Sequence, residues 1–139
     1  MKRITKVLAL LTVMGGLLPA AAVFAHDQAG SLAKAASSID YYQVQCGSGT
    51  TNLSVKIRDL SVSAATPLLS IQVFKDNRAT NTTDTVPNDA AYSSPASLVG
   101  GDGYYYMTVD KTATGSKNYH IVLHCEPYDD TRIFQIVNQ

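Results

Sequence analysis

Residues 103–125 read GYYYMTVDKTATGSKNYHIVLHC and contain two runs in which every second side chain is apolar. The apolar positions of the two runs are Tyr105, Met107 and Val109, followed by Tyr119, Ile121, Leu123 and Cys125. Alternation with a period of two is typical of β-strands that bury one face. The turn signal Thr114-Gly115-Ser116 lies between the runs, so we expect a β-hairpin with both apolar faces directed inward.

The same alternation recurs on both sides of this stretch. Strands are predicted around residues 42–46, 53–57, 69–73 and 133–137, with a weak edge strand within 77–94. The 133–137 run is ambiguous because apolar residues occupy both of its phases. Gly-, Pro-, Asn- and Asp-containing turn signals separate the runs, and no helix of ordinary length fits after residue 38. The sequence therefore predicts an all-β fold, an antiparallel, jelly-roll-like β-sandwich of about seven or eight strands.

The first 25 residues have the pattern of a bacterial secretory signal peptide. Three basic residues precede an apolar run at 7–18, and Val23-Phe24-Ala25 provides a cleavage site. This run is shorter than the roughly 20 residues that a membrane-spanning helix needs. We expect a periplasmic or extracellular protein with no membrane span after cleavage.

The chain after the cleavage site is expected to contain one domain. Residues 26–38 are small and polar and predict a flexible leader with at most one loose helical turn, so the sandwich is placed at residues 39–139. Of 11 basic side chains, three lie in the signal peptide, and all 11 acidic ones follow it, which leaves a net charge of −3. The basic residues form no stripe, so the composition disfavours nucleic acid as a partner.

Cys46 and Cys125 are the only cysteines. An even cysteine count in an exported chain favours a disulfide, and both residues lie in the apolar phase of their strands. The two cysteines lack the close spacing of a zinc site. We therefore expect one disulfide that joins an early strand to a late one.

Several short motifs resemble the bacterial pre-peptidase C-terminal domain. They are Asp40-Tyr41-Tyr42, the Gly103-Tyr104-Tyr105-Tyr106-Met107-Thr108-Val109 strand, Gly115, and Tyr119-His120-Ile121-Val122-Leu123. The resemblance covers about residues 39–125 and implies a non-catalytic β-sandwich that assists secretion or binds a substrate, a surface or, in some members, calcium. This chain differs from that family in its cysteine pair, and we expect no enzyme domain attached to it.

We expect a binding module rather than an enzyme. The sequence has none of the short catalytic, phosphate-binding or zinc motifs, and Glu126 is its only glutamate. In the expected hairpin, Tyr104, Tyr106, His120 and His124 point outward and form a candidate binding face. Exposed aromatic side chains of this kind suit contact with a polysaccharide, a peptide or a protein, although ordinary cross-strand packing would use the same residues.

The alternative function is copper binding in the periplasm. Cleavage after Ala25 would make His26 the new N-terminus, and its amine and imidazole nitrogens suit Cu(II). His120 or His124 would complete the site, but not both, because residues four apart on a strand are separated by about 13 Å. Calcium is another candidate cofactor, and its possible ligands are the loop residues Asp76, Asn77, Asp84, Asn88, Asp89, Asp129 and Asp130.

Overall fold

The computed structural model describes residues 26–139 except 62–66, 88 and 129–130, so the predicted signal peptide lies outside the described residues. The described residues form nine strands: β1 (His26–Leu32), β2 (Asp40–Cys46), β3 (Asn52–Asp59), β4 (Leu69–Lys75), β5 (Arg78–Asp84), β6 (Ala96–Val99), β7 (Gly103–Lys111), β8 (Lys117–Glu126) and β9 (Thr131–Val137). Within these ranges, no helix has the length and apolar character needed to cross a membrane.

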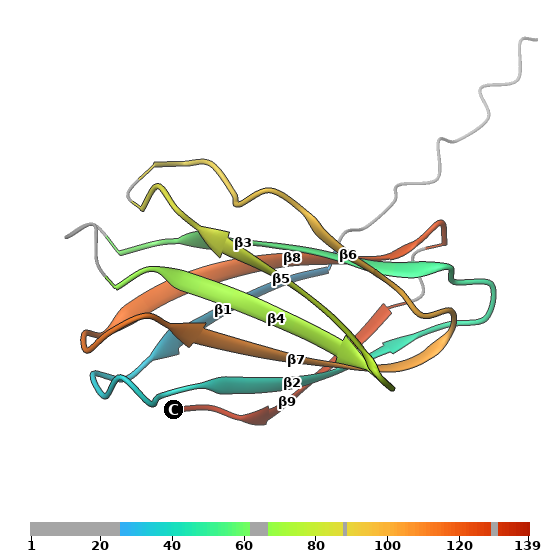
Figure 1. The fold of residues 1–139 in the computed structure, drawn as a ribbon, viewed down its shortest axis with the longest axis horizontal. Coiled ribbons are helices and arrows are strands. Elements are labelled where there is room, and N and C mark those ends of the chain that lie inside the picture. The colour runs from blue at the N-terminus through green and yellow to red at the C-terminus, as the bar shows by residue number, and fades with distance from the viewer. Residues whose placement is uncertain (1–25, 62–66, 88, 129–130) are drawn as a thin grey trace, which may run out of the picture.

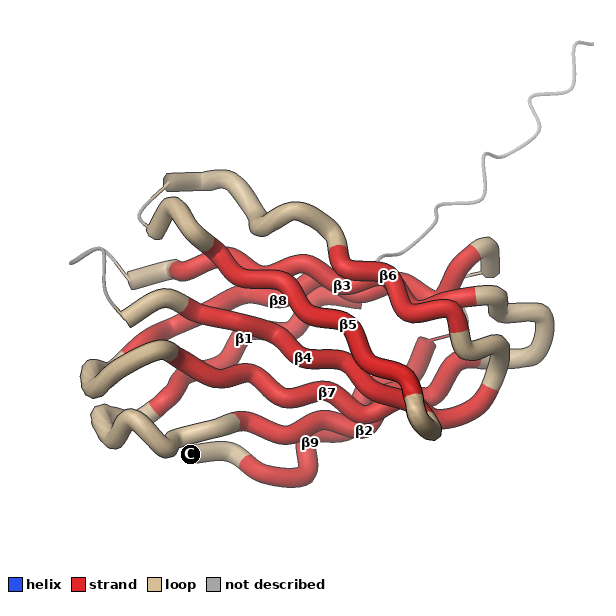
Figure 2. The backbone as a smooth tube through the Cα atoms, in the orientation of Figure 1, coloured by secondary structure: helices blue, strands red, loops and turns tan. Residues whose placement is uncertain are grey.

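The strands make two antiparallel sheets that pack face to face (Figure 1). The four-stranded sheet has the order β1-β8-β3-β6, and the five-stranded sheet has the order β5-β4-β7-β2-β9. Figure 2 shows strands throughout both layers, with loops gathered at the two ends. The prediction of an antiparallel β-sandwich is therefore confirmed.

The segment predicted to be a flexible leader, residues 26–38, contains a strand instead. Residues 26–32 form the edge strand β1, which pairs with β8 from His26 opposite Leu123 to Leu32 opposite Lys117. Only Leu32 of this strand is fully buried, so β1 shows no row of apolar residues in its sequence. An edge strand is held by backbone hydrogen bonds to one neighbour and needs few apolar side chains. The sandwich consequently includes residues 26–32, which were predicted to lie outside it.

The core lies between the inner faces of the two sheets. Tyr105 and Met107 project into it from the five-stranded sheet, and Ile121 and Leu123 project from the four-stranded sheet. Their side chains are at most 1% exposed. The strand phase expected for residues 103–125 is therefore correct, and burial of these rows supplies the main driving force for folding.

The hairpin predicted within residues 103–125 does not form. β7 pairs with β2 and β4, whereas β8 pairs with β1 and β3, so the two strands belong to different sheets. The five-residue connection 112–116 spans the roughly 10 Å between packed sheets instead of making a tight turn. Both arrangements bury the same alternate side chains, and for this reason alternation does not distinguish them.

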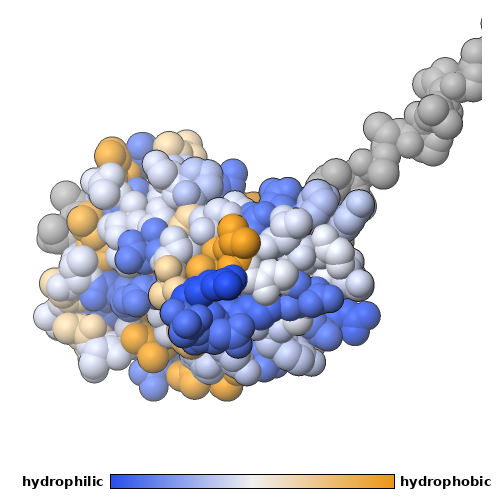
Figure 3. Space-filling view, turned by 45° about the vertical axis from the view of Figure 1, so that its right-hand side comes forward, coloured by the Kyte–Doolittle hydropathy of each residue, from blue (hydrophilic) through white to orange (hydrophobic). Residues whose placement is uncertain are grey.

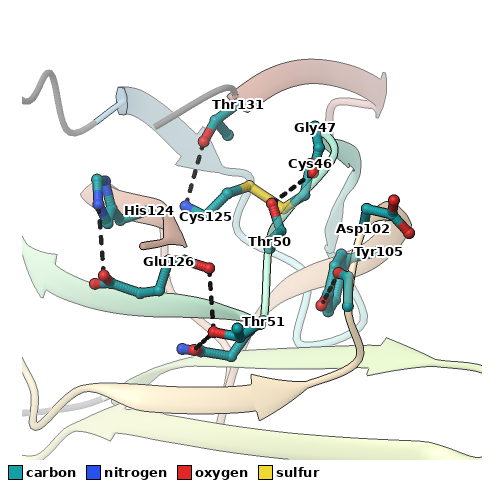
Figure 4. Close-up of a disulfide and its surroundings, with 12 residues drawn as sticks. Cys46, Gly47, Thr50, Thr51, Asp102, Tyr105, His124, Cys125, Glu126 and Thr131 are labelled. Carbon is teal, nitrogen blue, oxygen red and sulfur yellow. Dashed lines mark hydrogen bonds and ion pairs between the residues drawn. A yellow bond between two sulfur atoms is a disulfide. The ribbon is translucent and has the colours of Figure 1, made fainter. Parts of the chain in front are cut away.

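The disulfide joins the two sheets at one end of the core (Figure 4). Cys46 ends β2, and Cys125 lies near the end of β8, with 5.6 Å between their Cα atoms. The backbone N–H of Cys125 also donates a hydrogen bond to Thr131 Oγ1 at 3.3 Å, which connects the bond to the start of β9. The predicted disulfide is therefore confirmed, and it links β2 to β8.

A buried hydrogen-bond chain joins the same two strands at the opposite end. The Tyr119 hydroxyl donates to the Asp40 carboxylate, and the backbone N–H of Gln139 donates to the other carboxylate oxygen at 2.9 Å. Because Tyr119 gives its only hydroxyl hydrogen to Asp40, the Tyr42 hydroxyl must be the donor in its 2.5 Å contact with Tyr119. Gly30 lies opposite Tyr119 on β1, where a Cβ atom would collide with the phenol ring.

A second cluster of buried polar side chains lies at this end of the sandwich. The Lys117 ammonium lies 2.5 Å from the Asp59 carboxylate, and both side chains are almost completely buried. The Asp84 carboxylate accepts the backbone N–H of Asp59 at 2.7 Å. Buried charges need such partners, because a charge without one would be expensive to remove from water. These contacts join β8, β3 and β5.

We predict that no thiol can be labelled in the denatured, non-reduced protein, because both cysteines are consumed by the disulfide. Replacing Cys46 with Ser should lower the free energy of unfolding by about 2–5 kcal/mol, since the bond no longer restricts the unfolded chain. Thiol labelling and urea titration measure the two effects. Two labelled thiols in the denatured, non-reduced protein would contradict the disulfide.

Alkaline pH should destabilise the protein through its buried phenols. Burial raises the pKa of Tyr42 from 10.0 in a free phenol to about 12, and burial also raises the pKa of Tyr119. The unfolded chain therefore loses these protons first, and stability present below pH 10 is lost as the pH rises toward 12, by about 1.4 kcal/mol per pH unit for each phenol.

Tyr42→Phe removes one of these titrating groups, so its unfolding free energy should fall less steeply above pH 10 than that of the wild type. Urea titrations at several alkaline pH values measure this slope. Tyr128, which is 64% exposed, provides the control: Tyr128→Phe should leave the slope unchanged. Equal slopes for Tyr42→Phe and the wild type would show that the Tyr42 phenol is not protected in the folded state.

Candidate functional site

The outer face of the five-stranded sheet carries a compact group of aromatic rings. Tyr41 on β2, Phe74 on β4 and Tyr106 on β7 have ring centroids 5.9–6.4 Å apart. Their planes are nearly parallel, with angles of 4° between Tyr41 and Tyr106 and about 20° in the other two pairs. We call these three residues the ring triad and the outer surface of this sheet the aromatic face.

Strand alternation directs the triad outward. Tyr41 lies between the buried residues Asp40 and Tyr42, and Tyr106 lies between the buried Tyr105 and Met107. Phe74 follows the buried Val73 and stands directly opposite Tyr106 in the β4–β7 ladder. The rings from β2 and β4 approach each other across β7, so the strand order 4-7-2 creates the group.

Amide and hydroxyl groups surround the rings. The Gln43 amide donates to the Tyr106 hydroxyl at 3.4 Å, and the Gln72 amide donates to the Asp110 carboxylate at 3.2 Å. A phenol is protonated at neutral pH and can donate a hydrogen bond. Burial, and then the neighbouring Tyr106 phenol, raise the pKa of Tyr41 further. This surface can therefore contact apolar groups and hydrogen-bond with polar groups at the same time.

Two further aromatic side chains extend the aromatic face. Tyr104 on β7 is 48% exposed, and Phe134 on β9 is 47% exposed. Phe134 stands opposite Gln43, which separates it from Tyr106. Figure 3 shows hydrophobic residues in small separate groups among polar ones on the side of the molecule that it presents. On the aromatic face, the polar Gln43 lies between two of the rings, unlike the continuous apolar core of an obligate protein interface.

The four residues of the predicted binding face do not come together. Tyr104 and Tyr106 lie on the aromatic face, as their strand phase predicts, but His120 and His124 lie on the outer face of the other sheet. The predicted face is therefore wrong as a unit, because β7 and β8 are separated by the thickness of the sandwich. Its tyrosine half remains a candidate site.

His120 takes part in holding a loop. Its Nδ1 atom lies 2.6 Å from the hydroxyl of Tyr92, which belongs to the connection between β5 and β6. The Lys56 ammonium and the Arg58 guanidinium lie 4.8 and 4.9 Å from the centre of the Tyr92 ring, at cation–π distance. Asp27 is 4.0 Å from His120 Nε2. These contacts attach the loop to the four-stranded sheet.

His124 lies beside a shallow hollow on the same outer face. Its Nε2 atom is 3.7 Å from the Glu126 carboxylate, an ion pair when the imidazole is protonated (Figure 4). The hollow has a volume of about 210 Å³ and is also lined by Lys56 and Pro95. Small-molecule sites usually enclose about 300 Å³ or more, so this hollow is a weaker candidate than the aromatic face.

The structure does not assemble the predicted copper site. His26 stands opposite Leu123 and shares its inner-facing phase on β1, whereas His120 and His124 face outward from β8. The backbone of the sheet therefore separates His26 from both possible partners. Within residues 26–139, apart from the undescribed positions, no group of three or more His, Cys, Asp or Glu side chains could hold a metal ion.

The predicted calcium ligands are also dispersed. Asp76 and Asn77 occupy the β4–β5 turn, whereas Asp84 lies at the far end of β5 and is buried. Asp89 caps its own loop by accepting the backbone N–H of Ala91 at 2.9 Å. Asn88, Asp129 and Asp130 lie outside the described residues. The described candidates therefore lie at turns or at the buried end of the sandwich and do not gather around one point.

No protein-family model matches this chain, and no curated protein sequence matches it. The resemblance to the pre-peptidase C-terminal domain therefore stays a prediction from short motifs. The candidate site depends on the geometry of the aromatic face alone.

Tyr41, Phe74 and Gln43 belong to the candidate site but were not among the site residues predicted from the sequence. Strand phase places all three outward, because Tyr41 and Gln43 alternate with buried neighbours and Phe74 follows the buried Val73. Strand phase does not show that β4, β7 and β2 are adjacent in one sheet. This adjacency brings Tyr41, Phe74 and Gln43 close to Tyr106.

Strand phase also predicts how three consecutive tyrosines respond to truncation. Tyr105→Ser should lower the free energy of unfolding by about 3–5 kcal/mol, because its ring is completely buried. Tyr104→Ser should change it by no more than about 0.5 kcal/mol, because nearly half of that side chain is exposed. Tyr106→Ser should fall between them, since Tyr106 is half-buried against the other two rings of the triad. Urea titration ranks the variants, and equal losses at all three positions would contradict the register of β7.

Proposed function

We propose that this protein is an exported, non-enzymatic binding module that acts outside the cytoplasm and binds a macromolecule through its aromatic face. The observation that carries the proposal is the ring triad, three nearly parallel and partly exposed rings contributed by three adjacent strands. Tyrosine and phenylalanine offer large, rigid contact surfaces that lose little conformational freedom on binding.

Four further features support the proposal. The N-terminal sequence has a signal-peptide pattern, and the single disulfide suits an oxidising compartment. The resemblance to the pre-peptidase C-terminal domain implies a non-catalytic binding or secretion role. The outer face of the other sheet has a competing use, because Tyr92 and its cationic neighbours hold a loop against it. The aromatic face is therefore the better docking surface.

Fractionation of the cells that produce the protein tests this function. We expect the wild-type chain outside the cytoplasm and bound to a sedimenting envelope or surface fraction. The double variant Tyr41→Ser/Tyr106→Ser should be exported equally but recovered as free protein, because it lacks two of the three rings. Retention in the cytoplasm, or equal sedimentation of variant and wild type, would contradict the proposal.

Tyr128→Ser is the matched control, since it removes a tyrosine that is 64% exposed and lies outside the aromatic face. This variant should sediment as the wild type does. The thermal midpoints of all variants should be measured first, so that loss of binding is compared only among folded proteins.

A further inference from the structure

We propose that the ligand of the aromatic face is an uncharged polysaccharide that crosses the strands. This inference rests on the proposed function and specifies its ligand. The register of the five-stranded sheet arranges its outward side chains in rows perpendicular to the strands.

The central row contains two aromatic rings, an amide and a third ring. Phe74 stands opposite Tyr106, Tyr106 opposite Gln43, and Gln43 opposite Phe134. These residues come from four adjacent strands, β4, β7, β2 and β9. Three inter-strand spacings of about 4.8 Å give the row a length of about 14 Å, enough to contact a short oligosaccharide segment.

The next row supplies hydroxyl and amide groups. Gln72 stands opposite Thr108, and Thr108 stands opposite Tyr41, whose ring leans toward Tyr106 in the central row. A pyranose ring presents C–H groups on its faces and hydroxyl groups around its edge. Aromatic rings pack against the C–H faces, while amides and phenols exchange hydrogen bonds with the hydroxyls. The two rows offer both kinds of contact side by side.

The charge distribution favours an uncharged chain over an acidic one. Neither of these two rows contains a carboxylate, an amine, a guanidinium or an imidazole. On this outer face Asp110 lies one row beyond Thr108, and Arg132 lies one row beyond Tyr106, opposite Gln45. The charges are therefore at the margins and of opposite sign. An anionic polymer would need several cations along its path.

The same rows fit a protein partner less well. The core of a protein interface is usually a continuous apolar area depleted of polar groups. Here Gln43 interrupts the central row between Tyr106 and Phe134, and its amide already bonds the Tyr106 hydroxyl. Burying these amides against an apolar protein surface would leave hydrogen-bonding groups unsatisfied, whereas sugar hydroxyls would satisfy them.

Affinity electrophoresis of the purified, oxidised protein tests this inference. Native gels contain hydroxyethylcellulose, galactomannan, soluble starch or polygalacturonate, with a gel lacking polymer as the reference. We expect at least one of the three neutral polymers to retard the protein, and polygalacturonate not to. Added salt should leave the retardation unchanged, because no ion pair contributes to it.

Variants identify the surface responsible. Phe74→Ala and Tyr106→Ala should each weaken binding about tenfold, because each removes a ring from the central row. Tyr106→Phe should retain most of the affinity, since it keeps the ring and loses only a hydroxyl. Tyr128→Ala should bind as the wild type does, and thermal unfolding should show that every variant is fully folded at the temperature of the gel, even where its midpoint is lower.

Three results would overturn the inference: no retardation by any neutral polymer, salt-sensitive retardation by polygalacturonate alone, or equal retardation of Phe74→Ala and the wild type. The proposed function would survive the first result if Tyr41→Ser/Tyr106→Ser still abolished sedimentation with the cell fraction. Loss of that sedimentation after protease treatment of the fraction would then indicate a protein partner.

Discussion

The hydrogen bond between the Tyr119 hydroxyl and the Asp40 carboxylate determines how the two sheets align, because it joins β8 to β2 inside the core. The disulfide Cys46–Cys125 joins the same two strands at their other ends. Because β2 and β8 face each other from different sheets and are joined at both ends, neither can shift by one residue without breaking the hydrogen bond or straining the disulfide. The apolar rows between these two points are non-directional, so the two connections supply the specificity that burial alone lacks.

The polar end of the core explains several otherwise unexpected residues. Asp40 and Lys117 occupy inward-facing positions where alternation predicts apolar side chains, yet each has a partner. Gly30 leaves room on β1 for the Tyr119 ring, so the edge strand can close over the hydrogen-bond chain. Residues 26–32 therefore belong to the domain despite their polar composition, because their task is to cover this end rather than to fill the core.

The two outer faces serve different purposes. On the four-stranded sheet, Tyr92 is held between cationic side chains and His120, which attaches a loop to the sheet. On the five-stranded sheet, the ring triad faces outward beside amides and hydroxyls. A face that carries its own loop has fewer groups left for a partner, and this difference favours the five-stranded sheet as the binding surface.

The sequence by itself determined the secondary structure class, the disulfide and the face on which most strand residues lie, because each follows from local alternation or from cysteine count. Tyr105 was predicted to be buried, and Tyr104 and Tyr106 to point outward, and all three predictions are correct. Only the tertiary structure decided which strands are neighbours. The connection 112–116 can form a hairpin within one sheet or cross between sheets, and the same side chains are buried either way. That choice placed His120 and His124 on the far side of the sandwich and brought Tyr41 and Phe74 to Tyr106, so the candidate site arises from strand order, which no local pattern encodes.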